Sequence, residues 1–311
     1  MRTLTFTAVL TAAAATLVGC GNLSFGAHQE DRTYSAPAGT TALKIRSGGS
    51  RVEITGSDAP GIKVRERLTW SNDKNKPEPR HVAEGGTLAL TSKCAKVVVG
   101  LSGTGCGVSY RIEVPRGTPV EVDNDDGKIV ASGLGGTVRL HTDNGALKVT
   151  DLRATSVTLS SDDGPIEVSG HAATADLRSD NGPITATGLT ADRLTARTSD
   201  GHISVAGRVT VADIRTSNGG IDARGLTTDR ISAKTSDGPI DLRFAAAPTS
   251  VRATSGNGPV HVRVPRGEGY AITLTSGDGA ERIDPGVHQD SRSTRTIQLR
   301  SGDGALTVSP A

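Results

Sequence analysis

Aromatic side chains are scarce in this chain of 311 residues, at 2%, and there are three cysteines and one methionine. A hydrophobic core must therefore be built almost entirely from Val, Ile, Leu and Ala. An excess of charge is also lacking, because 35 Lys and Arg face 33 Asp and Glu, for a formal net charge of +2. Nucleic-acid-binding domains are clearly basic, so we expect no nucleic acid among the partners.

Long apolar runs are missing after the first twenty residues, which leaves no later segment fit for a transmembrane helix. Those twenty residues have a basic start, an apolar stretch over 4–18 and a small residue before Cys20, and this pattern predicts a signal peptide over 1–20. Leu17-Val18-Gly19-Cys20 resembles a bacterial lipobox, which implies cleavage before Cys20 and lipidation of its sulfur. An ordinary secreted protein is the alternative.

Lipidation at Cys20 would place the protein on the extracytoplasmic face of the cell membrane, with the membrane itself as a partner through the lipid anchor. Residues 21–40 are polar and small, and we expect a flexible tether there. The two other cysteines, Cys94 and Cys106, are expected to form a disulfide, because exported chains meet an oxidising compartment. No His or further Cys lies close enough in the sequence to complete a zinc site.

Asp-Gly and Asn-Gly dipeptides recur through the chain at a nearly constant spacing. Their glycines follow one another at intervals of 18 or 19 residues, at Gly127, Gly145, Gly164, Gly182, Gly201, Gly219 and Gly238, and at wider intervals thereafter. A longer unit of 37 residues is also visible, since Gly188–Arg193 recurs as Gly225–Arg230. Such a period indicates a repeat architecture.

Apolar and polar residues alternate between these dipeptides, as in strands with one buried face. Asp-Gly and Asn-Gly would suit type I′ hairpins and an antiparallel meander or sandwich. The constant period favours a single-stranded, right-handed β-solenoid with 18–19 residues per coil, because equivalent residues then stack. We predict this solenoid over 119–311, preceded by a less regular β capping region with the disulfide loop over 41–118.

Several segments resemble a known family. Val114-Pro115-Arg116-Gly117, the stretch 120–129 and the repeated Thr-Ser-Asp-Gly units resemble the bacterial "putative adhesin" β-strand-repeat family of unknown function, over residues 41–308. The resemblance implies an all-β repeat fold, surface adhesion and a link to envelope stress responses. It supplies no catalytic residues, and a fold alone does not define a function.

A basic residue ends the second strand of four consecutive periods, just before the turn. We call Arg178, Arg197, Arg215 and Lys234 the basic column, since a solenoid would stack them about 4.8 Å apart. Clustered cations could bind phosphate-rich envelope polymers or anionic headgroups. The alternative is a solvated face, neutralised by the nearby acids Asp176, Asp192, Asp213 and Asp229.

Carboxylates in the turns offer a second candidate site. Stacked Asp162, Asp163, Asp180 and Asp200 could present oxygens to calcium. However, Asn alternates with Asp in these dipeptides, and turn Asp and Asn are explained by bonds to their own backbone and by tolerance of left-handed dihedrals. We therefore expect neither a metal nor a cofactor.

No cluster of catalytic residue types stands out, so an enzyme is not expected. The sequence favours a non-enzymatic, lipid-anchored cell-surface protein, adhesin-like or an envelope scaffold, with envelope polymers or surface proteins as candidate partners. One alternative is an envelope-stress sensor that binds an anionic ligand through the basic column. Another is a glycan-active β-helix enzyme, which would need a pair of carboxylates in a groove.

Overall fold

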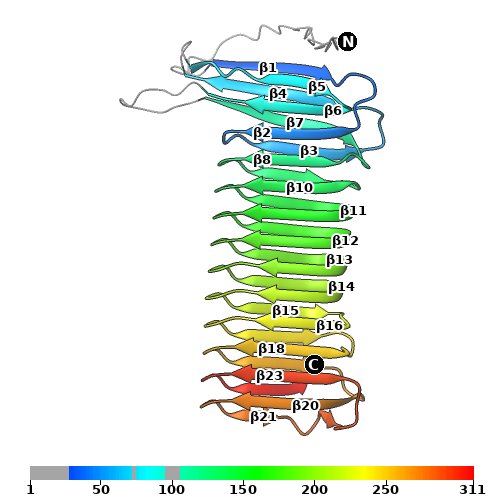
Figure 1. The fold of residues 1–311 in the computed structure, drawn as a ribbon, viewed down its shortest axis with the longest axis vertical. Helices are drawn as coiled ribbons and strands as arrows, with labels where there is room; N and C mark the ends of the chain where they lie inside the picture. Colours follow the sequence, from blue (N-terminus) through cyan, green and yellow to red (C-terminus); the bar gives the residue numbers. More distant parts are fainter. Residues whose placement is uncertain (1–27, 72–74, 95–105) are drawn as a thin grey trace, which may run out of the picture. The chain divides into compact units, whose positions relative to one another are not determined.

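Strands make up the regular structure of the computed structural model, which describes residues 28–71, 75–94 and 106–311. This part of the chain contains 24 strands and no α-helix, and hence no helix long and apolar enough to cross a membrane (Figure 1). The predicted signal peptide, Cys20 and the first part of the predicted tether lie outside the described residues. Contacts divide the chain into two units, the first ending at Gly145 and the second spanning Ala146–Ala311.

The first unit combines antiparallel and parallel pairing. Its strands are β1 (His28–Ser35), β2 (Ala42–Ser47), β3 (Val52–Ser57), β4 (Lys63–Trp70), β5 (Arg80–Glu84), β6 (Thr87–Ser92), β7 (Gly107–Pro115), β8 (Val120–Asn124), β9 (Ile129–Ser132) and β10 (Thr137–Thr142). Strands β1, β4 and β7 form an antiparallel sheet, and β5 and β6 form an antiparallel hairpin. Parallel pairs join β2 with β6 and β8, and β3 with β7 and β9.

Strand β1 differs from the sequence expectation, which placed a flexible tether over 21–40. Its eight residues pair with β4 in continuous antiparallel register. Polar contacts hold it there: Arg67 binds the Asp31 carboxylate at 2.8 Å, and the Tyr34 hydroxyl donates to Glu66 at 3.0 Å. The strand was missed because it has almost no apolar residues to create an alternating pattern.

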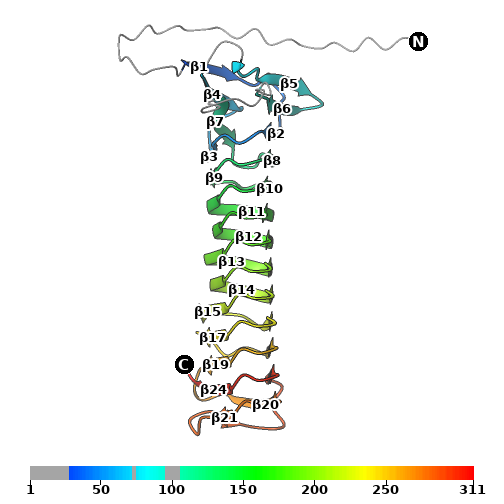
Figure 2. The same cartoon turned by 90° about the vertical axis from the view of Figure 1, so that its left-hand side faces the viewer.

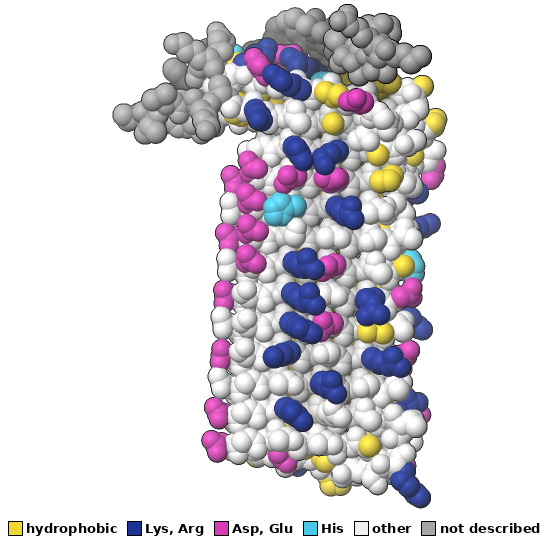
Figure 3. Space-filling model, in the orientation of Figure 1, with side chains coloured by type: hydrophobic (Ala, Val, Ile, Leu, Met, Phe, Trp, Pro, Cys, Tyr) yellow, Lys and Arg dark blue, Asp and Glu magenta, His cyan; other side chains and the backbone are white. Residues whose placement is uncertain are grey.

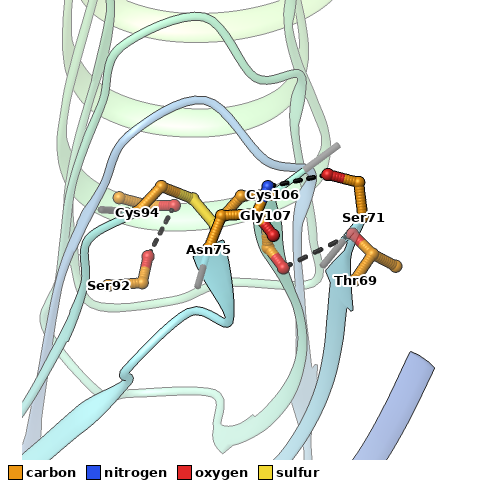
Figure 4. Close-up of a disulfide and its surroundings, with 8 residues drawn as sticks. Thr69, Ser71, Asn75, Ser92, Cys94, Cys106 and Gly107 are labelled. Carbon is orange, nitrogen blue, oxygen red and sulfur yellow. Dashed lines mark hydrogen bonds between the residues drawn. A yellow bond between two sulfur atoms is a disulfide. The ribbon is translucent and has the colours of Figure 1, made fainter. Parts of the chain in front are cut away.

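The predicted disulfide is confirmed, with Cys94 and Cys106 joined at an S–S distance of 2.05 Å. It ties the chain just after β6 to the start of β7, where the Thr69 hydroxyl of β4 donates to the Gly107 carbonyl at 3.5 Å (Figure 4). Closing a loop of this size stabilises a fold by about 3 kcal/mol in the chain-entropy model.

The second unit is a stack of coils whose strands pair in parallel, residue on equivalent residue. Parallel pairing rules out the antiparallel meander here and confirms the β-solenoid. Its strands are β11 (Leu147–Ser161), β12 (Ile166–Ser179), β13 (Ile184–Arg197), β14 (Ile203–Arg215), β15 (Ile221–Leu226), β16 (Arg230–Lys234), β17 (Ile240–Phe244), β18 (Ser250–Ser255), β19 (Val260–Val264), β20 (Gly269–Ser276), β21 (Glu281–Ile283), β22 (His288–Gln289), β23 (Thr296–Ser301) and β24 (Leu306–Pro310).

Each coil has two arms that face each other (Figure 2). The side chains buried between the arms are mostly aliphatic. In β13 the first arm buries Ile184 and Ala186, and the second buries Leu194 and Ala196. The two arms form two parallel sheets, which we call the first-arm sheet and the second-arm sheet. The first-arm sheet contains the starts of β11–β14 and then β15, β17, β19, β24 and β21. The second-arm sheet contains the ends of β11–β14 and then β16, β18, β23 and β20.

Parallel stacking begins earlier than the predicted boundary at 118/119. In the first unit, Leu43 of β2 pairs with Val120 of β8, and Val52 of β3 pairs with Ile129 of β9. The coil geometry therefore reaches back into the segment expected to be a cap, while the boundary between the compact units falls at 145/146.

The last coil of the sequence is not the last coil of the stack. β23 pairs with β18 on one side and with β20 on the other, and β24 likewise lies between β19 and β21. The C-terminal segment is thus inserted between two coils that precede it in the sequence. This insertion accounts for the wider spacing of the final dipeptides, because the chain must pass around the inserted coil.

Candidate functional site

The basic column forms as predicted on the second-arm sheet. Arg178 of β12 pairs with Arg197 of β13, which pairs with Arg215 of β14, which pairs with Lys234 of β16. Their sequence neighbours Leu177, Ala196, Ile214 and Ala233 are buried in the core, so the period-2 alternation directs the cations outward. Basic side chains accordingly gather in rows over this face (Figure 3).

Two of the four predicted neutralising acids bind the column. Asp176 pairs with Arg178 at 2.8 Å, and Asp213 bridges Arg197 at 3.2 Å and Arg215 at 3.1 Å. Asp192 and Asp229 make no ion pair with the column among the described residues, and each lies at the start of its second arm. Two of the four acids expected to neutralise the column therefore form ion pairs with it, and the other two do not in the described part of the chain.

Other cations on the same sheet were missed by the sequence reasoning. Arg193 pairs in register with Val211, and Val211 with Arg230, so these two arginines occupy alternate coils beside the basic column. Arg252 and Arg300 lie on β18 and β23, further along the sheet. The 37-residue repeat could have predicted this pair, since Arg193 and Arg230 are equivalent residues of consecutive repeat units.

The turn carboxylates pair with asparagines across neighbouring coils. In the second unit, the amides of Asn181, Asn218 and Asn257 donate to Asp163, Asp200 and Asp237, respectively. An Asn layer therefore separates consecutive Asp layers at this position. No group of three or more His, Cys, Asp or Glu among the described residues has the geometry of a metal site.

A denser acidic turn lies in the first unit, at Asp125 and Asp126. Burial, followed by the negative charges of Asp143, Asp126 and Asp123, raises the pKa of the Asp125 carboxyl, and nearby His141 opposes this shift. The Asn144 amide donates to Asp126 at 2.5 Å. Burial and, after it, the crowding of like charges both disfavour the ionised carboxyl, so ionisation of Asp125 weakens this turn.

Glu66 of β4 is the most deeply buried carboxylate among the described residues of the first unit, and its side chain is fully buried. Its Oε1 accepts a hydrogen bond from the Tyr34 hydroxyl at 3.0 Å and lies 2.6 Å from His81 Nε2. Burial, followed by the Glu66 charge, raises the pKa of both Tyr34 and Tyr110. These contacts join β1, β4 and β5, so we interpret the cluster as structural.

The described residues of the first unit line a larger and a smaller open cleft. The larger, of about 1520 Å³, is lined by charged side chains that include Arg46, Lys76, Arg80 and Asp123. The smaller, of about 810 Å³, lies against β1, β4 and β7 and includes Arg65 and Arg111. Neither cleft includes a residue of the basic column.

Comparison with known proteins gives a family and several solved structures, of which three are named here. The family model described as Toastrack DUF4097 matches residues 40–212 and 206–309. The structures are a "putative adhesin" from Bacteroides fragilis NCTC 9343 (15% identity, TM-score 0.46, 91% of this chain and 97% of that chain), a "putative adhesin" from Parabacteroides distasonis ATCC 8503 (14%, 0.47, 91% and 97%) and a "putative cell adhesion protein" from Clostridium sporogenes ATCC 15579 (13%, 0.23, 91% and 100%). None of the curated proteins matches the chain.

Proposed function

The chain belongs to the Toastrack DUF4097 family, and we propose that it is a non-enzymatic, lipid-anchored protein of the cell surface that acts as an adhesin-like or scaffold module. The observation that carries this proposal is the stacking of equivalent residues in the second unit. Stacking repeats the same outward side chains from coil to coil, which suits an extended surface or polymer better than one small molecule.

The chemistry of the described residues also supports a non-enzymatic role. The turn carboxylates are spaced by asparagines, and Glu66 is enclosed by tyrosine and histidine rather than by a second carboxylate. A glycosidase needs two carboxyl groups about 5–9.5 Å apart across a sugar-binding groove. The partners we propose are the membrane, through the lipid, together with envelope polymers or surface proteins, and not nucleic acid.

Lipid anchoring can be tested with the full chain in a bacterial host that processes lipoproteins. Labelled palmitate should be incorporated into the wild-type protein, and Cys20→Ser should abolish both the label and the membrane fraction. The matched control is Cys94→Ser with Cys106→Ser, which changes the two other cysteines and should keep the label. Label retained in the Cys20→Ser variant would refute the anchor.

Adhesion itself needs a separate measurement. Cells that display the full chain should adhere to immobilised envelope material better than cells without it, and whole-cell retention under flow would measure the difference. Equal retention would refute the adhesin-like role and would leave a scaffold whose partner is in the same envelope.

A second candidate, envelope-stress sensing through an anionic ligand, is favoured by the register of the basic column. An Arg197→Glu/Arg215→Glu variant should then lose a partner that the wild-type chain captures from envelope extracts and that high salt also releases. Capture that survives both the double substitution and high salt would argue against this sensor.

A further inference from the structure

Positive charge on the second-arm sheet is concentrated in three consecutive coils. Each strand there presents three outward positions: Arg193, Thr195 and Arg197 on β13, then Val211, Asp213 and Arg215 on β14, then Arg230, Ser232 and Lys234 on β16. The formal charges of the three strands are therefore +2, 0 and +2. We call Arg193, Arg197, Arg215, Arg230 and Lys234 the central patch.

Most of this charge has no internal counterion. Asp213 is shared between Arg197 and Arg215, whose side chains stay 43% and 54% exposed. Arg193, Arg230 and Lys234 are exposed and make no ion pair among the described residues. At the outward positions of the three strands, five cations thus face one carboxylate. Asp192 and Asp229 directly precede Arg193 and Arg230 without forming an ion pair with them in the described part of the chain, and even when these two acids are counted the patch keeps an excess of two positive charges for an external anion.

The first-arm sheet of the same unit provides the contrast. Its cations are largely matched by acids on neighbouring positions: Arg224 pairs with Asp222 at 2.7 Å, Arg263 with Asp241 at 2.5 Å, and Lys148 with Glu167 at 2.7 Å. The excess positive charge therefore belongs to one face of the solenoid rather than to its general composition.

The side chains of the central patch indicate the chemistry of its ligand. Four of the five cations are arginines, whose planar guanidinium groups bind phosphate or carboxylate oxygens in a bidentate manner. No aromatic side chain lies on β13, β14 or β16. Stacking of nucleobases needs such rings, so the patch can recognise charge but has no platform for bases.

The spacing of the patch indicates an extended ligand. Neighbouring strands lie about 4.8 Å apart, so the two doubly charged strands are about 9.6 Å apart across the sheet. Arg193 and Arg197 are four residues apart on one strand, or about 13 Å. A single phosphate group could contact only one or two of these cations, whereas a flexible chain of phosphates could follow all five.

We propose that the central patch binds a linear phosphate polymer of the cell envelope that lies across β13, β14 and β16. This inference rests on the proposed surface function, and it names the class of partner that the second unit would bind. Thr195 and Ser232, in the middle of the two doubly charged strands, add hydroxyl donors between the cations.

The test uses the full-length lipidated protein in detergent micelles, with inorganic polyphosphate as the probe and fluorescence anisotropy as the readout. Long polyphosphate should bind with an affinity that falls steeply with salt, and triphosphate should bind far more weakly. Arg193→Gln/Arg230→Gln should weaken binding by about tenfold or more and lower the slope of log K against log salt by about 2, one unit for each lost phosphate contact.

The matched control is Arg224→Gln/Arg243→Gln, which removes the same charge from the first-arm sheet of the same unit. It should change the affinity less than threefold. An equal loss in this control, or polyglutamate binding as tightly as polyphosphate, would overturn the proposal. Failure of polyphosphate binding with adhesion intact would refute only this inference, whereas loss of adhesion or anchoring with binding intact would refute only the proposed function.

Discussion

Glycine is required in the turns of the solenoid because neighbouring coils approach each other too closely for a side chain. A Cβ atom on Gly201 would lie 2.1 Å from the Gly182 carbonyl oxygen of the preceding coil, and Gly182 has the same relation to Gly164. The hydroxyl of Thr198 completes the turn: it accepts a hydrogen bond from the Gly201 N–H at 3.1 Å and donates to the Gly182 carbonyl at 3.2 Å.

Replacing Gly201 with alanine should therefore destabilise the second unit by about 1–3 kcal/mol, the usual range for overpacking a close contact. The change is measured from the midpoint of urea unfolding. Gly117→Ala is the control, because a Cβ there would meet nothing within 4 Å, and it should leave the midpoint nearly unchanged. Equal effects of the two substitutions would contradict this account of the turn.

The sequence predicted where these turns occur but not why. Tolerance of left-handed dihedrals was one of the two reasons expected for Asp and Asn in the turns, yet Asp151 is the only non-glycine residue with a positive φ in the described ranges. The turn glycines from Gly127 to Gly258 are also absent from the positive-φ set. That interpretation was wrong, because the requirement comes from the adjacent coil, and contacts between coils cannot be derived from one turn in isolation.

Two acids of the first unit should respond to pH in opposite directions. The pKa of Asp125 is raised by burial and neighbouring acids, so its ionisation destabilises the fold. Asp125→Asn should raise the free energy of unfolding at neutral pH, and the gain should shrink as the pH falls through the raised folded pKa and vanish below the ordinary value of 3.8.

Asp31 is the matched control, because the Arg67 guanidinium lowers the pKa of its carboxyl. Its ionised form is favoured in the folded state, so this contribution is complete above 3.8 and is lost as the pH falls through the lowered folded pKa. Asp31→Asn should therefore destabilise at neutral pH and become neutral in acid. Urea unfolding at several pH values measures both, and the same sign for both variants would contradict the assignment.

At the scale of elements, strand pairing within the repeat could be predicted from the sequence, whereas strand β1 and the insertion of β23 could not. The constant period places Ile184 over Ile203 and Ile203 over Ile221, as expected. Strand β1 was not predicted because hydrogen bonds and ion pairs hold it in place, and its sequence lacks the apolar alternation that identifies a strand. The insertion of β23 between β18 and β20 was not predicted, because a sequence period gives the order of coils in the stack only when that order follows the sequence.

The inserted coil leads to a prediction at this scale. Ile297 of β23 is fully buried between Val251 of β18 and Ile272 of β20, whereas Ile272 itself is only partly buried. Ile297→Ala should cost about 2–5 kcal/mol, as for other buried aliphatic truncations, and Ile272→Ala clearly less. If the coils were stacked in sequence order, β23 would be at the end of the stack, and Ile297→Ala would cause the smaller loss of stability. Chemical denaturation of the two variants distinguishes the two arrangements.

At the scale of the whole molecule, the two units differ in what stabilises them. The first unit has the disulfide and the buried Glu66 contacts, while the second unit is a series of coils whose stability comes mainly from nearest-neighbour stacking. In such a stack, a local perturbation affects the adjacent elements most strongly. The central patch belongs to the second unit, including the three cations that make no ion pair among the described residues, Arg193, Arg230 and Lys234.

Reduction of Cys94–Cys106 should accordingly loosen the first unit and leave the second nearly unchanged. The bridge ties the end of β6 to the start of β7, and its loss should cost about 3 kcal/mol, the chain-entropy value for a loop of this length. Hydrogen exchange measured by mass spectrometry, with and without a reductant, should show faster exchange in β4, β6 and β7 and unchanged exchange in β12–β14. Faster exchange throughout β12–β14 would show that the chain unfolds as one cooperative body, and the separation into two energetically distinct units would then be wrong.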